Sequence, residues 1–235
     1  MRGSSGCFEA YQIPVRDMKT TQRFGGLLAL GVIACTTALS PATARTESEA
    51  STRIDIAVGS TAEYRVREQL ARLNFPNDAV GTTDSLAGSV VIGPAGAIGA
   101  GGKLTVDLRD LRSDADRRDA FLRENTLHTN RFPMAEFVAR RQQGLPMPLP
   151  STGKAAFKLI GDMTIHGVTS ELVWDVTASF TSTAVTGEAA TRFPFRKFGL
   201  AIPRVMGLLS VDDDIRLVLK FKARRTEVAT GSSSN

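Results

Sequence analysis

The stretch GDMTIHGVTSELVWDVTASF, residues 161–180, decides the fold. Apolar and polar side chains alternate on both sides of His166-Gly167, and the apolar set after this turn runs from Leu172 to Phe180. Alternate residues of a β-strand point to opposite faces of the sheet. The stretch therefore predicts a long hairpin with one apolar and one polar face, and a curved partner sheet has to cover the apolar face.

The same alternation recurs along the chain and predicts further strands. They are centred on residues 53–57, 62–71, 86–92, 104–109, 135–139, 155–159, 185–195 and 215–223. Three segments are irregular or rich in turn residues and are expected to be loops, namely 74–84, 93–102 and 196–210. The strands do not alternate with helices, which argues against a parallel sheet. About eight antiparallel strands, each with one apolar face, predict an all-β fold closed into a barrel without exposed edges.

One segment changes to a helical period. Ser113 is placed to cap a helix over about residues 114–126, with Asp114 and Asp116 in its first turn. The adjacent Arg118 and Asp119 are expected to form a structural pair between helix and barrel. A later loop, residues 142–153, carries three apolar side chains and is expected either to fold back on the body or to line an opening.

Strand parity assigns fifteen apolar side chains to the barrel interior, where they would contact any ligand. An eight-stranded barrel is either filled by side chains or hollow enough for one small ligand, and the mixed sizes of the interior residues allow both. The fifteen are Val66, Leu70, Val90, Ile92, Leu104, Val106, Phe137, Phe157, Leu159, Leu172, Trp174, Phe180, Phe193, Leu217 and Phe221.

Glu68 is the one carboxylate on an apolar strand face. A buried carboxylate has to be paired, protonated or at a wet rim. Two interpretations follow: a salt bridge near the end of the barrel, or a contact to the polar headgroup of a ligand.

The segment before the barrel predicts export. Residues 18–44 begin at Met18 with a basic region, continue with an apolar run from Phe24 to Leu39 and end in Ala42-Thr43-Ala44. This order is typical of a signal peptide cleaved after the second alanine, so the mature chain would begin at Arg45. Met18 fits the true start, because residues 1–17 show no targeting pattern.

A competing interpretation takes Val32-Ile33-Ala34-Cys35 as a lipobox, which would anchor a periplasmic lipoprotein through Cys35. Both interpretations export the protein, to the periplasm or out of the cell. The sequence thus divides into an extension and export signal at 1–44, a tether at 45–52, the barrel at 53–226 and a tail at 227–235 that is disordered by composition.

Three motifs, in this order, resemble the YceI-like family of lipocalin-like barrels that bind polyisoprenoid lipids. They are LRDLRSDADRRDAFLRENTLHTNRFP at 108–133, GDMTIHGVT at 161–169, and FRKFGL at 195–200 with the later Val211-Asp212-Asp213. The resemblance covers roughly residues 53–225. It implies an eight-stranded antiparallel lipocalin-like barrel, and an isoprenoid or other long apolar lipid as the ligand.

The sequence departs from the family pattern near the first strand. The family's D-x-x-H-S element is represented by Asp55 and Ser60, but Gly59 stands where the histidine is expected. The loops at 77–83 and after Ile92 are also atypical.

Other chemistries find little support in the residues. His166 and His128 are interpreted as turn residues rather than bases. With these two histidines and both cysteines upstream of the barrel, no metal-ligand spacing occurs, and no cofactor or nucleotide motif is present. The net charge of +5 is weak and scattered and does not indicate nucleic acid.

The sequence therefore predicts a non-enzymatic, exported lipid carrier. Such a carrier is compatible with contact to a membrane surface and with a homodimer. The alternative is a filled barrel that acts as a structural, stress-related or membrane-redox-associated interaction protein. The volume of the barrel interior discriminates between the two.

Overall fold

A computed structural model describes residues 51–228 of the 235-residue chain. The predicted export signal, the lipobox and most of the predicted tether and tail lie outside the described residues. The barrel region itself is slightly longer than predicted, because Ser51 and Thr52 already belong to the first strand and Glu227 and Val228 to the last.

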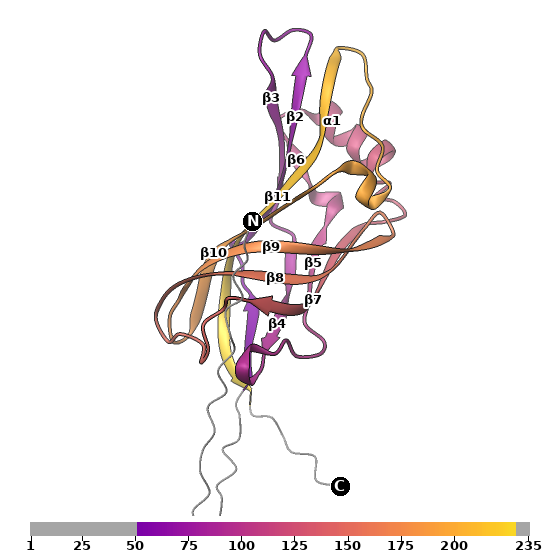
Figure 1. Cartoon of the computed structure of the whole chain (residues 1–235). Coiled ribbons are helices and arrows are strands. Elements are labelled where there is room, and N and C mark those ends of the chain that lie inside the picture. Colours follow the sequence, from indigo (N-terminus) through magenta and orange to yellow (C-terminus); the bar gives the residue numbers. More distant parts are fainter. Residues whose placement is uncertain (1–50, 229–235) are drawn as a thin grey trace, which may run out of the picture. The chain divides into compact units, whose positions relative to one another are not determined.

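Eight antiparallel strands form a closed ring, as the sequence predicts. Their order around the barrel is β1, β4, β5, β7, β8, β9, β10 and β11, and β1 closes the ring by pairing with β11 (Figure 1). The bounds are β1 Ser51–Ile56, β4 Leu86–Ile92, β5 Lys103–Asp107, β7 Met134–Gln143, β8 Gly153–Ile165, β9 Val168–Phe180, β10 Ala184–Phe193 and β11 Leu208–Val228.

The predicted hairpin is the longest strand pair, with β8 and β9 in register from Gly153↔Phe180 to Ile165↔Val168. The turn has positive φ at both central residues, 53° at His166 and 75° at Gly167. This is the geometry of a two-residue hairpin turn whose twist matches that of the strands. The turn role predicted for His166 is confirmed.

Strand β11 is long enough to pair with two strands in tandem on the same side. Its last part, from Ala223, pairs with β1, and its first part pairs with β2 (Thr61–Leu70). At the junction the buried Ser60 hydroxyl donates to the carbonyl of Ala57 or of Lys222, and it accepts from the Lys222 amide at 2.9 Å. Ser60 thus stabilises the step from one strand to the next, although the family's histidine before it is replaced by Gly59.

The sheet continues beyond the ring. β2 pairs with β3 (Asn77–Thr83), which pairs with the short β6 (Arg112–Ser113), and together with the start of β11 they rise above the barrel in Figure 1. The prediction of a loop over residues 74–84 was therefore wrong for 77–83. The loop predicted for 196–210 overlaps the turn Phe195–Phe198 and the beginning of β11.

The helical segment covers one side of this extension. It begins later than predicted, with α1 at Asp116–Phe121 followed by one wider turn at Leu122–Thr126. Ser113 does not cap it. Its amide and hydroxyl instead donate to the buried carboxylate of Asp119.

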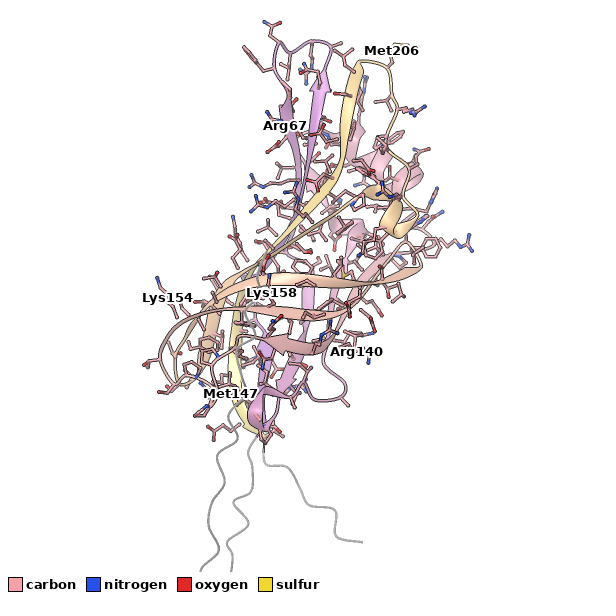
Figure 2. All side chains as sticks on the ribbon, in the orientation of Figure 1. Arg67, Arg140, Met147, Lys154, Lys158 and Met206 are labelled. Carbon is pink, nitrogen blue, oxygen red and sulfur yellow. The ribbon has the colours of Figure 1, made fainter. Side chains whose placement is uncertain are left out.

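The far end of the barrel is closed by the apolar loop at 142–153. Leu145 is buried, and Met147 and Leu149 pack against the core. Figure 2 shows Met147 at this end and Met206 at the opposite one. The loop thus folds back on the body, which decides between the two interpretations of its sequence.

Candidate ligand-binding cavity

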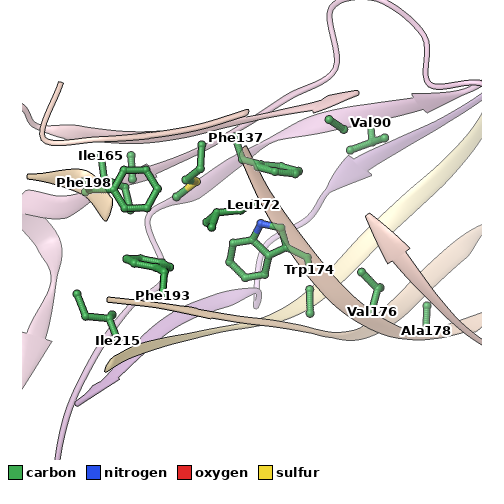
Figure 3. Close-up of a cluster of buried hydrophobic side chains, with 14 of the residues drawn as sticks. Val90, Phe137, Ile165, Leu172, Trp174, Val176, Ala178, Phe193, Phe198 and Ile215 are labelled. Carbon is green, nitrogen blue, oxygen red and sulfur yellow. The ribbon is translucent and has the colours of Figure 1, made fainter. Parts of the chain in front are cut away.

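The barrel is hollow. A cavity of about 780 Å³ runs through its interior and continues under the β2–β3 extension. Most of its wall is apolar, and several of the buried side chains in Figure 3 belong to it, among them Phe137, Trp174 and Phe193. Volumes of roughly 300–1,000 Å³ are typical of pockets that bind small molecules. The interior therefore has room for a ligand after the side chains are in place.

Fourteen of the fifteen apolar residues predicted from parity lie on the cavity wall. The exception is Leu172, which is buried in the core cluster but does not reach the cavity. Leu172 pairs in register with Gly161 on β8, and in Figure 3 it lies among the large side chains of the cluster. Contact of these residues with a ligand stays a prediction.

Several wall residues were missed by the sequence prediction. Met163, Val176 and Ala189 share the parity of predicted neighbours and could have been found from that signal. The helical residues Phe121 and Leu122 and residues 205–207 of the loop before β11 lie outside the alternating strands, so strand parity could not find them.

Two aromatic side chains of the wall pack against glycines on neighbouring strands. A Cβ on Gly187 would lie 3.0 Å from the Phe221 ring, and one on Gly81 would lie 2.2 Å from the Tyr64 ring. In both pairs the two residues are directly opposite on neighbouring strands. Each glycine thus leaves room for the aromatic ring opposite it.

Two polar atoms on this wall have no hydrogen-bond partner among the described residues. They are the hydroxyl of Tyr64 and the indole Nε1 of Trp174, whose residue is only 8% exposed. Burial raises the pKa of the Tyr64 hydroxyl. A buried donor without a partner costs free energy, so each of these groups favours a ligand that offers an acceptor.

One ion pair is built into the wall. Arg118 Nη2 lies 2.9 Å from Oε1 of Glu68, and the Asn77 amide donates to the same oxygen at 3.3 Å. The predicted salt bridge of Glu68 is confirmed. The prediction that Arg118 pairs with Asp119 was wrong, because Arg118 reaches across to β2 and also contacts Asp114.

The cavity opens at the end where this ion pair lies. Among its lining residues, the exposed ones are Ala71, Arg72, Arg117, Val205, Met206 and Gly207. All six belong to the β2–β3 turn, to α1 or to the loop before β11. The mouth therefore lies between the tip of the extension, the helix and this loop.

The comparisons with known proteins agree with this architecture. Residues 57–223 match the YceI-like domain. The chain belongs to the YceI-like family. No curated protein matches the sequence.

Two solved structures share the fold of this YceI-like domain. A polyisoprenoid-binding domain from Saccharophagus degradans, described as implicated in plant cell wall breakdown, aligns with a TM-score of 0.59 at 12% identity, covering 74% of this chain and 98% of its own. BcnA from Burkholderia cenocepacia aligns with a TM-score of 0.54 at 14% identity, covering 72% and 99%. At these identities the likeness concerns the fold.

The two histidines of the YceI-like domain meet outside the cavity. Nδ1 of His128 lies 2.8 Å from Nε2 of His166, and the Phe132 ring packs edge-on against His166. Burial, then the neighbouring His128 and Arg131, lower the pKa of His166. The pair joins the segment after the helix to the β8–β9 turn.

Residues 51–228 contain neither a metal-ligand cluster nor a membrane-spanning helix. No three histidine, cysteine or carboxylate side chains gather there as metal ligands. No helix in this range has the length and hydropathy needed to span a membrane.

Proposed function

We propose that the protein is a non-catalytic carrier that holds an isoprenoid-like or other long apolar lipid inside its barrel. The observation that carries this proposal is the largely apolar cavity of about 780 Å³, with the ion pair of Glu68 and Arg118 among its lining residues. A lipid tail offers only apolar surface, and its transfer into such a hollow is favourable by about 25 cal/mol per Å² removed from water. The hollow interior argues against the filled-barrel alternative. The polyisoprenoid-binding domain of the same fold supports this ligand class.

The polar side chains of the wall would receive the headgroup of the lipid. Glu68, Arg118 and the unpartnered Tyr64 hydroxyl all line the cavity, and Glu68 and Arg118 form the ion pair described above. A headgroup oxygen could accept from Tyr64 without breaking that ion pair. The tail would then extend towards the closed end of the barrel, along the fourteen apolar residues named above.

Export is part of the proposal. The signal pattern before Arg45 supports a cleaved, periplasmic or secreted protein. Intact-mass measurement of the exported protein tests it. A chain starting at Arg45 is expected, whereas an acylated Cys35 at the N-terminus would overturn cleavage and make the protein a membrane-anchored lipoprotein.

The carrier function is tested by extracting lipid from purified protein. We expect wild-type protein to yield a long apolar lipid by mass spectrometry, and Val106→Arg to yield almost none. The new charge would lie unpaired on the apolar wall. Contact between an unpaired charge and a lipid tail costs free energy, so the lipid should no longer bind. Thr177→Arg places the same charge on the exposed face of β9 and should retain the lipid. Circular dichroism confirms that each variant folds. The proposal fails if wild type carries no lipid or if folded Val106→Arg retains as much as wild type.

A further inference from the structure

The mouth of the cavity is surrounded by exposed apolar side chains. We call residues 71–76 and 201–209 the rim, because these two segments supply five of the six exposed lining residues. Six of the ten large apolar side chains exposed within residues 51–228 belong to these fifteen positions. They are Leu73, Phe75, Ile202, Val205, Met206 and Leu209, with Phe75 78% and Met206 103% exposed.

The two segments of the rim are adjacent in the structure. The Ala71 amide donates to the Gly207 carbonyl at 2.9 Å, and Leu70 pairs in register with Leu208. The exposed apolar side chains therefore gather around one opening instead of being scattered over the surface. Gatherings of this kind mark surfaces that contact a membrane or another protein.

The charge of the rim is positive. It contains Arg72 and Arg204 and no carboxylate, and neither arginine forms an ion pair within residues 51–228. Arg117 on α1 adds a third exposed cation at the mouth, next to Asp116, and the exposed carboxylate of Asp114 lies near Arg72. Apolar side chains flanked by arginines are complementary to an anionic lipid surface, where the apolar groups enter the interface and the cations face the headgroups.

We infer that the rim docks on an anionic membrane surface. This inference deepens the proposed function and rests on it, because it assigns the face through which an apolar cargo passes between bilayer and cavity. If the mouth of the cavity lies against the lipid headgroups, the cargo lipid can pass between the bilayer and the cavity without entering water. A second copy of the chain fits the rim less well, since a two-fold contact would bring its arginines together without any carboxylate of the rim between them.

The test is co-flotation with vesicles. Wild-type protein is expected to float with vesicles of phosphatidylcholine and phosphatidylglycerol in equal amounts, and more weakly with phosphatidylcholine alone. The double substitution Phe75→Glu with Met206→Glu should abolish flotation. Val58→Glu is the matched control, because Val58 is 100% exposed but lies in the β1–β2 turn, outside the rim.

A second pair of variants isolates the charge. Arg72→Gln with Arg204→Gln should weaken binding to the anionic vesicles about 25-fold, since each basic residue near an anionic surface contributes about fivefold. The control exchanges two exposed cations outside the rim, Lys154→Gln with Arg216→Gln, and should bind as wild type does.

Lipid extraction of the same variants separates this inference from the proposed function. Protein that carries lipid but floats with neither vesicle overturns docking and leaves the carrier intact. Protein that floats through its rim but never carries lipid supports docking and contradicts the carrier. A third outcome is that wild type does not float with vesicles but forms a dimer, and that Phe75→Glu with Met206→Glu converts this dimer to a monomer. The rim would then bind a second copy of the chain, and the inference would be wrong.

Discussion

Arg118 on the helix and Glu68 on β2 form an ion pair with both side chains largely removed from solvent, 18% and 9% exposed. The pair joins the helical cover to the sheet extension directly beneath the mouth of the cavity. Removal of one partner from such a pair leaves the other charge buried with less compensation.

Arg118→Ala is therefore expected to lower the free energy of unfolding by about 3 kcal/mol, the lower end for a broken buried pair because Arg118 keeps some solvent contact. Arg117→Ala, next to it on the exposed face of the helix, should change it by less than about 0.5 kcal/mol. Urea unfolding followed by circular dichroism measures both. Equal effects of the two substitutions would show that the ion pair does not stabilise the fold.

The histidine pair predicts how stability depends on pH. The folded pKa of His166 is lowered from its usual value of about 6.5, chiefly by burial and then by His128 and Arg131. As the pH falls below about 6.5, the unfolded chain takes up this proton before the folded protein does. The contribution of His166 is thus present above pH 6.5 and is lost as the pH falls through the folded pKa.

His166→Asn should remove that part of the pH dependence. Asparagine tolerates the positive φ of this turn, so the hairpin is expected to remain. Urea midpoints measured from pH 7.5 down to pH 5 should fall more steeply for wild type than for the variant, while the contribution of the carboxylates is common to both. Parallel curves would contradict a lowered pKa of His166.

The close approach of the Thr177 backbone to Gly187 predicts that only glycine fits at this position. A Cβ at Gly187 would lie 2.2 Å from the Thr177 carbonyl oxygen, so that backbone has to move. Gly187→Ala should destabilise the fold by about 2 kcal/mol, as overpacking does. Gly93→Ala is the control, because its nearest neighbour would lie at 3.4 Å and its φ of −82° suits any residue. A loss of stability at Gly93 as large as that at Gly187 would contradict this account.

The sequence predicts the ring well, and the reason is physical. Each barrel strand has one face in the interior, so apolar and polar side chains alternate along nearly every strand. This alternation correctly predicts fourteen residues of the cavity wall. β3 was missed for the opposite reason. Its residues Asn77, Asp78 and Gly81 favour turns, and they are held in a strand by pairing with β2, where Gly81 accommodates the Tyr64 ring.

The mouth could not be predicted from periodicity. It is assembled from a turn, a helix and a loop whose exposed apolar residues have no regular spacing. The partner of Glu68 was also hidden, because Arg118 is 50 residues away along the chain and reaches it only after the helix folds over the extension. The carboxylate of Glu68 on an otherwise apolar strand face nonetheless correctly indicated a buried ion pair.

The central claim is that an apolar ligand occupies the hollow, and Trp174 reports on it directly. It is the single tryptophan of the chain, and it lies on the cavity wall with its Nε1 unpartnered within the described residues. Its emission is therefore sensitive to whatever fills the barrel.

The measurement is a titration of delipidated protein with geranylgeraniol, followed by Trp174 emission. A saturable change at about one ligand per chain is predicted for wild type and for Thr177→Arg, and none for folded Val106→Arg. An emission spectrum of wild type that does not respond, or one that responds equally in Val106→Arg, would contradict the carrier account.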